Sequence, residues 1–232
     1  MHYCGVVPAY GLLQLVMLEE VRRPEPPIRL GAVFFEPGTA RQIAAELTAL
    51  GEVVVAIGAP LTDVAGARAC DDLLRARGVV PARPEPAAQE LAEALAPLGV
   101  FQAPDHGQEG PVPDGAFRAG SVFETNTDAV FFSLQRRRLP AKRHPQGMRL
   151  RIAELSEDQV LDDDGDLWQR RIEEIDAAGA ALCAHRYAVG HASWLGEPSE
   201  GVVVLPGSSI PAEFSPDGVL APVERLQLPP VD

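Results

Sequence analysis

The sequence predicts an α/β fold, because short apolar runs of strand length alternate with longer segments whose apolar residues recur at helical spacing. Val53–Ile57 (VVVAI) is continuously apolar, as in a strand that is covered on both faces. Leu167–Val189 has the clearest helical periodicity. The 232 residues, 46% of them apolar, are enough for one large domain with a sizeable core.

Strand signals dominate the first part of the chain. Tyr3–Val7 and Leu12–Val21 are apolar runs that Pro8–Gly11 separates, which predicts two strands joined by a turn. Ile28–Phe35 is rich in β-branched and aromatic residues and predicts a third strand. A helix that ends at Gly51 is expected next, before the buried strand.

The rest of the chain predicts more helices than strands. Helices are expected at Asp63–Arg77, Ala87–Leu98 and Asp128–Gln135, strands at Ser121–Glu124 and Val202–Leu205, and loops at Gln102–Gly115 and Glu157–Asp166. Within Leu167–Val189, one helical face is expected to carry Trp168, Ile172, Ile175, Gly179 and Leu182. The small uncharged residues 177–184 (AAGAALCA) permit close packing on a sheet. We expect one domain over residues 1–210 and an extended proline-rich tail over residues 211–232.

Composition narrows the class of protein. No apolar run approaches the roughly 20 residues that cross a bilayer, and the N-terminus resembles a strand and not a signal peptide, so a cytoplasmic location without membrane contact is expected. Three widely spaced cysteines fit reduced thiols. One lysine against nineteen arginines indicates a GC-rich, bacterial genome.

Charge is distributed unevenly along the chain. The net charge of −13 argues against a general nucleic-acid coat protein. Residues 129–153, however, contain no acidic side chain and carry seven positive charges. This stretch is either a solvated basic loop or a local phosphate-contacting patch.

Several catalytic chemistries are excluded by missing motifs. The sequence contains no phosphate loop before Lys142, no dinucleotide fingerprint after a strand, no His-Glu-x-x-His motif and no Gly-x-Ser-x-Gly elbow. His185 and His191 are six residues apart, which places them on different sides of a helix, so zinc binding with Cys183 is disfavoured.

Four segments together resemble a bacterial and archaeal family of unknown function, placed in the ribonuclease H-like superfamily and described as predicted nucleases. The segments are CGVVPA at the N-terminus, VVVAIGAPL at 53–61, RACDDLLRARG at 68–78, and the stretch from FETNTD through AKRHPQGMRLR to EEIDAAGAALCA. The resemblance covers roughly residues 3–206. It implies a mixed sheet of three antiparallel strands followed by parallel strands, flanked by helices. Val53–Ile57 should then lie parallel to Tyr3–Val7, with Leu167–Val189 packed across the sheet.

The resemblance also implies a site for divalent metals, Mg²⁺ or Mn²⁺, held by carboxylates that activate water and stabilise a leaving oxygen. Two of the expected carboxylates are replaced here, by Val7 and Gly58. Glu124 and Asp176 match the remaining two positions, and they are the expected catalytic and metal-binding residues.

Further residues complete the expected site. Glu173 lies one helical turn before Asp176 and is a third candidate metal ligand, with Asp63 as another. Lys142, Arg143 and Arg151 are the candidate phosphate-binding residues. Glu124 and Asp176 are expected to converge at the end of the sheet where Val7 and Gly58 meet.

Three functions remain open at this point. The first is a metal-dependent nuclease acting on RNA or DNA, with weak or absent activity because two carboxylates are missing. The second is a non-catalytic relative that binds a nucleic acid, a protein partner or a second copy of the chain. The third, binding of a small phosphorylated metabolite, is disfavoured because no glycine-rich cradle is visible.

Overall fold

The computed structural model describes residues 1–21, 29–62, 68–105, 107–162 and 165–216. Strands of this part are β1 (His2–Ala9), β2 (Leu12–Val21), β3 (Arg29–Phe34), β4 (Val53–Ile57), β5 (Glu109–Pro111), β6 (Val122–Glu124), β7 (Val160–Asp162), β8 (Ala192–Glu197) and β9 (Gly201–Pro206). The helices are α1 (Ala40–Leu50), α2 (Ala69–Ala76), α3 (Pro86–Ala94), α4 (Thr127–Gln135), α5 (Pro145–Glu157) and α6 (Ile172–Ala188).

All nine strands form one mixed sheet, in the order β5-β8-β9-β6-β4-β1-β2-β3-β7. The first three strands are antiparallel neighbours, and β4 adds to the other side of β1 in parallel. Strand β6 continues this parallel series, with Ile57 of β4 beside Glu124. The α/β class is therefore confirmed, and so is the parallel pairing of Val53–Ile57 with the first strand.

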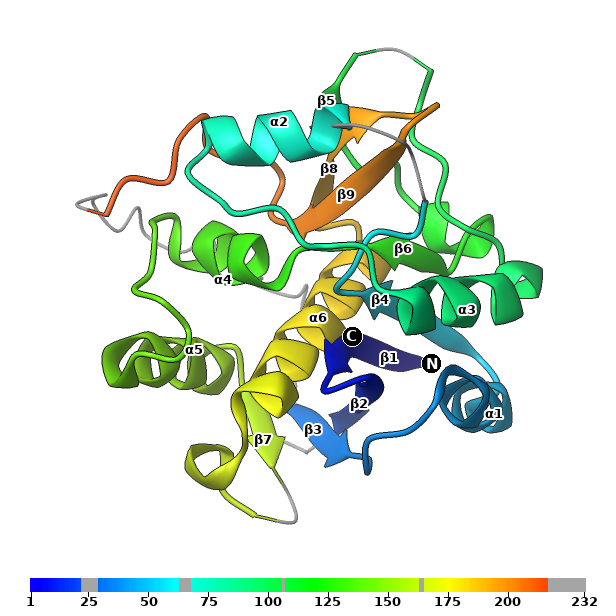
Figure 1. The fold of residues 1–232 in the computed structure, drawn as a ribbon, viewed down its shortest axis with the longest axis vertical. Helices are drawn as coiled ribbons and strands as arrows, with labels where there is room; N and C mark the ends of the chain where they lie inside the picture. The colour runs from blue at the N-terminus through cyan, green and yellow to red at the C-terminus, as the bar shows by residue number, and fades with distance from the viewer. Residues whose placement is uncertain (22–28, 63–67, 106, 163–164, 217–232) are drawn as a thin grey trace, which may run out of the picture.

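Helices cover both faces of the central strands. Side chains along each of these strands point alternately to the two faces, so each face carries an apolar layer. Cys4 and Val6 of β1 belong to the layer beneath α1 and α3. Tyr3 and Val7 of the same strand belong to the layer that includes α4, α5 and α6. Figure 1 shows α6 crossing the middle of the sheet, where it packs on β1, β2 and β4.

The close approach of α6 to β1 explains the small residues of its uncharged stretch. A Cβ atom added at Gly5 would lie 2.0 Å from the carbonyl oxygen of Ala177 and 2.3 Å from the amide nitrogen of Ala181. Glycine in β1 and alanines in α6 thus let the two backbones touch, and the prediction that this helix packs across the sheet is confirmed.

Several predicted boundaries differ from the structure. The segment Leu167–Val189 begins as a separate 3₁₀ turn, Leu167–Gln169, and Trp168 on this turn is 57% exposed and not on the buried helical face. The predicted loops at 102–115 and 157–166 contain β5 and β7, and neither α5 nor β8 was expected. Helix α2 begins at Ala69, and residues 63–67 of the longer predicted helix lie outside the described residues.

The C-terminal region is described as far as residue 216. Phe214, inside the predicted tail, is buried against Phe132 of α4, so this first part of the tail packs on the domain. None of the helices in the described part of the chain is long and apolar enough to cross a membrane.

Candidate functional site

The carboxyl ends of β1, β4 and β6 meet at one edge of the central sheet, and Val7, Gly58 and Glu124 lie there. Gly58 follows β4 directly, and its amide donates a hydrogen bond to the carbonyl of Val6 (2.8 Å). A Cβ atom at Gly58 would lie 2.9 Å from Cγ1 of Val7 and 3.1 Å from Cγ2 of Thr127. Val7 and Gly58 therefore meet as expected, and methyl groups fill the space beside Gly58.

Glu124 ends β6 and is buried, with 4% of the residue exposed. Its carboxylate accepts hydrogen bonds from Nη1 (2.7 Å) and Nη2 (2.6 Å) of Arg68 and from the amide of Leu61 (3.0 Å). Burial raises the pKa of Glu124 above its ordinary value, against the opposing effect of the Arg68 guanidinium. Burial acts to lower the pKa of Arg68, but the hydrogen bonds with Glu124 raise it overall. The two groups form a buried ion pair.

Arg68 also joins this pair to the start of α2. It is 3% exposed, and it donates to both carboxylate oxygens of Asp71 in the first turn of the helix. Sequence reasoning missed Arg68, although it opens the segment RACDDLLRARG. An arginine just before a helix with acidic residues in its first turn is the signal that was available, and it is a weak one.

Asp176 lies near the start of α6 and is also buried. Its Oδ2 accepts a hydrogen bond from Nζ of Lys142 (2.5 Å), and its Oδ1 is buried without a hydrogen-bond partner. Burial raises the pKa of Asp176, while Lys142 and Arg151 act to lower it. Lys142 is thus the counterion of Asp176, with its side chain 39% exposed.

The other predicted site residues are also ion-paired. Glu173 accepts a hydrogen bond from Arg143 (2.9 Å). Arg151 is 1% exposed and donates to Asp128 (2.6 Å) as well as to two backbone carbonyls. The guanidinium of Arg151 is thus held inside the chain, where its Nε is buried without a hydrogen-bond partner, and its phosphate-binding role stays a prediction.

The residues present do not fit a two-metal centre. Glu124 and Asp176 share none of the hydrogen-bond or charged partners given above, and each has its own internal cation. Within the described ranges, no group of three or more His, Cys, Asp or Glu side chains is placed to hold a metal ion. One unpartnered oxygen on Asp176 falls far short of the oxygen ligands that Mg²⁺ requires. Asp63, the further candidate ligand, lies outside the described residues.

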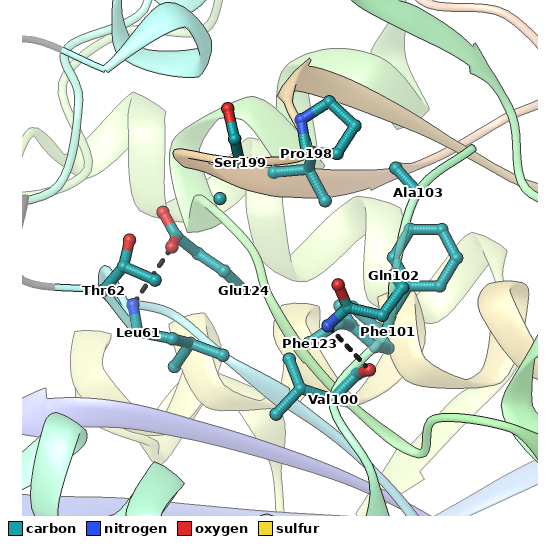
Figure 2. Close-up of a pocket in the computed structure, with 12 residues that line it drawn as sticks. Leu61, Thr62, Val100, Phe101, Gln102, Ala103, Phe123, Glu124, Pro198 and Ser199 are labelled. Carbon is teal, nitrogen blue, oxygen red and sulfur yellow. Dashed lines mark hydrogen bonds between the residues drawn. The ribbon is translucent and has the colours of Figure 1, made fainter. Parts of the chain in front are cut away.

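A pocket of about 250 Å³ opens beside Glu124. Figure 2 shows the carboxylate of Glu124 at one side of this pocket, next to Leu61 and Thr62, with Gln102 and Pro198 across from it. The pocket thus lies at the carboxyl end of β4 and β6, which is where α/β sheets commonly bind ligands.

The comparisons with known proteins found one similar structure and no family. No family model and no curated protein matches the chain. Among solved structures, the chain is similar to that of RuvC from Thermus thermophilus, at 15% sequence identity, over 81% of this chain and 94% of that chain, with a TM-score of 0.38. At this level of similarity no residue role transfers from one chain to the other.

Proposed function

We propose that this chain is a ribonuclease H-like domain that binds a ligand or partner without cleaving phosphodiesters. Its fold assignment is supported by the order of the central strands, in which an antiparallel β3-β2-β1 unit is followed by parallel β4 and β6 with α6 across them. Three of the four sequence segments that resemble predicted nucleases include parts of this core, and the fourth, RACDDLLRARG, forms α2.

The observation that carries the loss of catalysis is the ion pairing of both retained carboxylates. Arg68 holds Glu124 and Lys142 holds Asp176, so each negative charge is neutralised within the chain. A divalent ion in a nuclease activates a coordinated water and stabilises the leaving oxygen. A guanidinium or an ammonium supplies positive charge but coordinates no water for attack. Val7 and Gly58 supply no side-chain oxygen at the two positions where the resemblance implies carboxylates, and methyl groups of Val7 and Thr127 lie where a side chain at Gly58 would extend.

The ion pairs of the basic residues also bear on what kind of partner the chain would bind. Lys142, Arg143 and Arg151, the residues that would contact phosphates, are paired with Asp176, Glu173 and Asp128. A chain of net charge −13 with these cations occupied attracts a nucleic-acid backbone weakly. We therefore favour an uncharged ligand or a protein partner over binding to phosphate groups.

Cleavage assays test this proposal directly. The purified chain would be incubated with RNA, single-stranded DNA and duplex DNA in Mg²⁺ or Mn²⁺, beside the variant Asp176→Asn. We expect neither the wild-type chain nor Asp176→Asn to cleave any of these substrates. We also expect calorimetry to show no heat of Mn²⁺ binding. Cleavage by the wild-type chain that Asp176→Asn abolishes would refute the proposal, and so would cleavage by both proteins that follows the chain through a further purification step.

A further inference from the structure

The pocket beside Glu124 has an apolar floor and a polar rim. Phe101, Phe123 and Val202 line it and are at least nine-tenths buried, whereas Gln102 and Thr62 are exposed. Its volume of about 250 Å³ lies below the roughly 300–1,000 Å³ of sites for drug-sized ligands. The space therefore suits a single small ring system, whose faces would contact the apolar floor.

The walls of this pocket are fixed by contacts behind them. The rings of Phe101 and Phe123 pack on Tyr187 of α6, at centroid distances of 5.4 and 4.6 Å. The turn between β8 and β9 is held by Glu200, whose carbonyl accepts from Thr62 (3.0 Å) and whose carboxylate accepts from the amide of Ala69 (2.8 Å). A pocket whose walls are already ordered loses little conformational entropy when a ligand binds.

Two side chains of the pocket lining keep acceptor positions for a donor group of a ligand. An ionised carboxylate has about four acceptor positions, and Glu124 uses three of them for Leu61 and Arg68. The amide nitrogen of Gln102 donates to the carbonyl of Val100 (3.3 Å), and Figure 2 shows the amide oxygen on the side away from that bond. Acceptor positions thus remain on both Glu124 and Gln102, and the hydroxyl groups of Thr62 and Ser199 also line the pocket.

The charges around the pocket disfavour an anionic occupant. Neither Lys nor Arg is among the residues that line the pocket in the described part of the chain. Arg68 pairs with both Glu124 and Asp71, so one cation serves two carboxylates beside the pocket. The pocket therefore offers no positive charge to a phosphate or a carboxylate, and a group that donates hydrogen bonds suits it better.

From these features we infer that the pocket binds a flat heteroaromatic ring that presents an amino group, namely an amino-bearing purine or pyrimidine base. The apolar floor would hold the ring, and the amino group would donate to Glu124 or Gln102, in the way that acidic side chains accept from the amino group of cytosine. This inference goes beyond the loss of catalysis and does not depend on it.

Calorimetric titration with cytidine and uridine tests the inference. The two nucleosides differ only in that cytidine has an amino group and a ring nitrogen acceptor where uridine has a carbonyl and a ring N–H. We expect cytidine to bind about tenfold or more tightly than uridine, since a carbonyl would face the acceptors of the pocket. Adenosine and guanosine would show whether purines enter as well. A short oligocytidylate would distinguish a base within a strand from a free nucleoside.

Variants locate the binding in this pocket. Gln102→Leu keeps the size of an exposed side chain, and we expect it to weaken cytidine binding about fivefold, which corresponds to one hydrogen bond. Val100→Trp at the rim should block entry. The control Gln169→Leu changes an exposed glutamine on the 3₁₀ turn before α6 and should leave binding unchanged, with melting curves for all variants.

Each result decides for or against the pocket. Cytidine binding that both rim variants weaken supports the inference, and preference for the oligocytidylate would assign the base to a strand. Equal binding of cytidine and uridine would overturn recognition of the amino group. Binding that Val100→Trp leaves intact, or no binding of any nucleoside or oligonucleotide up to the millimolar range, would overturn the site.

Discussion

At the scale of single residues, a guanidinium and a divalent ion satisfy a carboxylate in different ways. Arg68 gives Glu124 two parallel N–H donors and one positive charge, a geometry that holds the carboxylate firmly in place. Magnesium instead keeps several of its waters and is held by one or two carboxylates together with the substrate. Arg68 therefore supplies positive charge to the buried Glu124 without the coordinated water that a divalent ion would bring.

The first prediction concerns this pair. Arg68→Met leaves Glu124 buried without its counterion, so we expect the free energy of unfolding to fall by about 3–5 kcal/mol. Arg75→Met, on the same helix, removes an exposed ion pair with Asp72 and should cost less than about 1 kcal/mol. Urea denaturation of both variants measures the difference, and equal losses would contradict a buried role for Arg68.

A second prediction concerns the packing of Gly58 against Val7. The Cβ atom of Gly58→Ala would lie 2.9 Å from Cγ1 of Val7, so we expect a loss of stability of about 1–3 kcal/mol. In the background Val7→Ala the same change should cost less, because the contacting methyl group is gone. A double-mutant cycle by chemical denaturation measures this coupling, and strictly additive effects would mean that the two residues do not compete for this space.

At the scale of helices and strands, periodicity predicted the elements that bury a continuous apolar surface. Val53–Ile57 and the small-residue stretch of α6 were found because burial on both sides leaves an uncharged run in the sequence. Helix α5 was missed because Arg149 and Arg151 interrupt its apolar pattern, and Arg151 is buried through its pairing with Asp128 on another helix. Such pairing between distant segments leaves no local pattern.

The candidate site was likewise predicted only in part. The resemblance placed Val7, Gly58 and Glu124 at the ends of neighbouring strands, and the structure has them at one edge of the sheet. The partner of Glu124 could not be predicted, because Arg68 lies 56 residues away in the chain and approaches only through the placement of α2.

The third prediction tests the contact between α6 and β1. Gly5→Ala would place Cβ 2.0 Å from a backbone oxygen of α6, and backbone atoms of a packed helix cannot rotate away. We expect a loss of more than about 4 kcal/mol, or no soluble folded protein. Gly38→Ala is a matched control, because its Cβ would meet only side-chain atoms of Gln42 and Ile43 at 3.2 Å or more, and it should cost about 1–2 kcal/mol. Thermal denaturation compares the two, and a mild effect of Gly5→Ala would contradict the backbone contact.

At the scale of the whole molecule, the interior holds several ionisable groups although the chain has a net charge of −13. Burial raises the pKa values of Glu124, Asp158 and Asp176, and an internal cation opposes the shift at each of them. Glu154 of α5 differs from these three, because the charge of Arg186 opposes the shift of its pKa less than a hydrogen bond from a neutral side chain does. It is 2% exposed, and its hydrogen-bond donor is the neutral amide of Gln135. Stability as a function of pH should therefore depend strongly on this carboxyl group.

The last prediction follows from that difference. Burial, assisted by the nearby charge of Asp158, raises the pKa of Glu154 from 4.5 to about 7 in the folded protein. A carboxyl group whose folded pKa exceeds its unfolded value stabilises the fold below the unfolded pKa, and this contribution is lost as the pH rises through the folded pKa. The free energy of unfolding of the wild-type chain should thus fall by up to about 3 kcal/mol between pH 4.5 and pH 7, at about 1.4 kcal/mol for each pH unit.

Glu154→Gln stays neutral and still accepts from Gln135, so it should match the wild type near pH 4.5 and exceed its stability above pH 7. Urea denaturation across this range measures the difference. The exposed Glu46→Gln on α1 is the control, and it should follow the wild-type curve because it leaves Glu154 unchanged. Parallel curves for wild type and Glu154→Gln would mean that the buried carboxyl group titrates as it does in the unfolded chain.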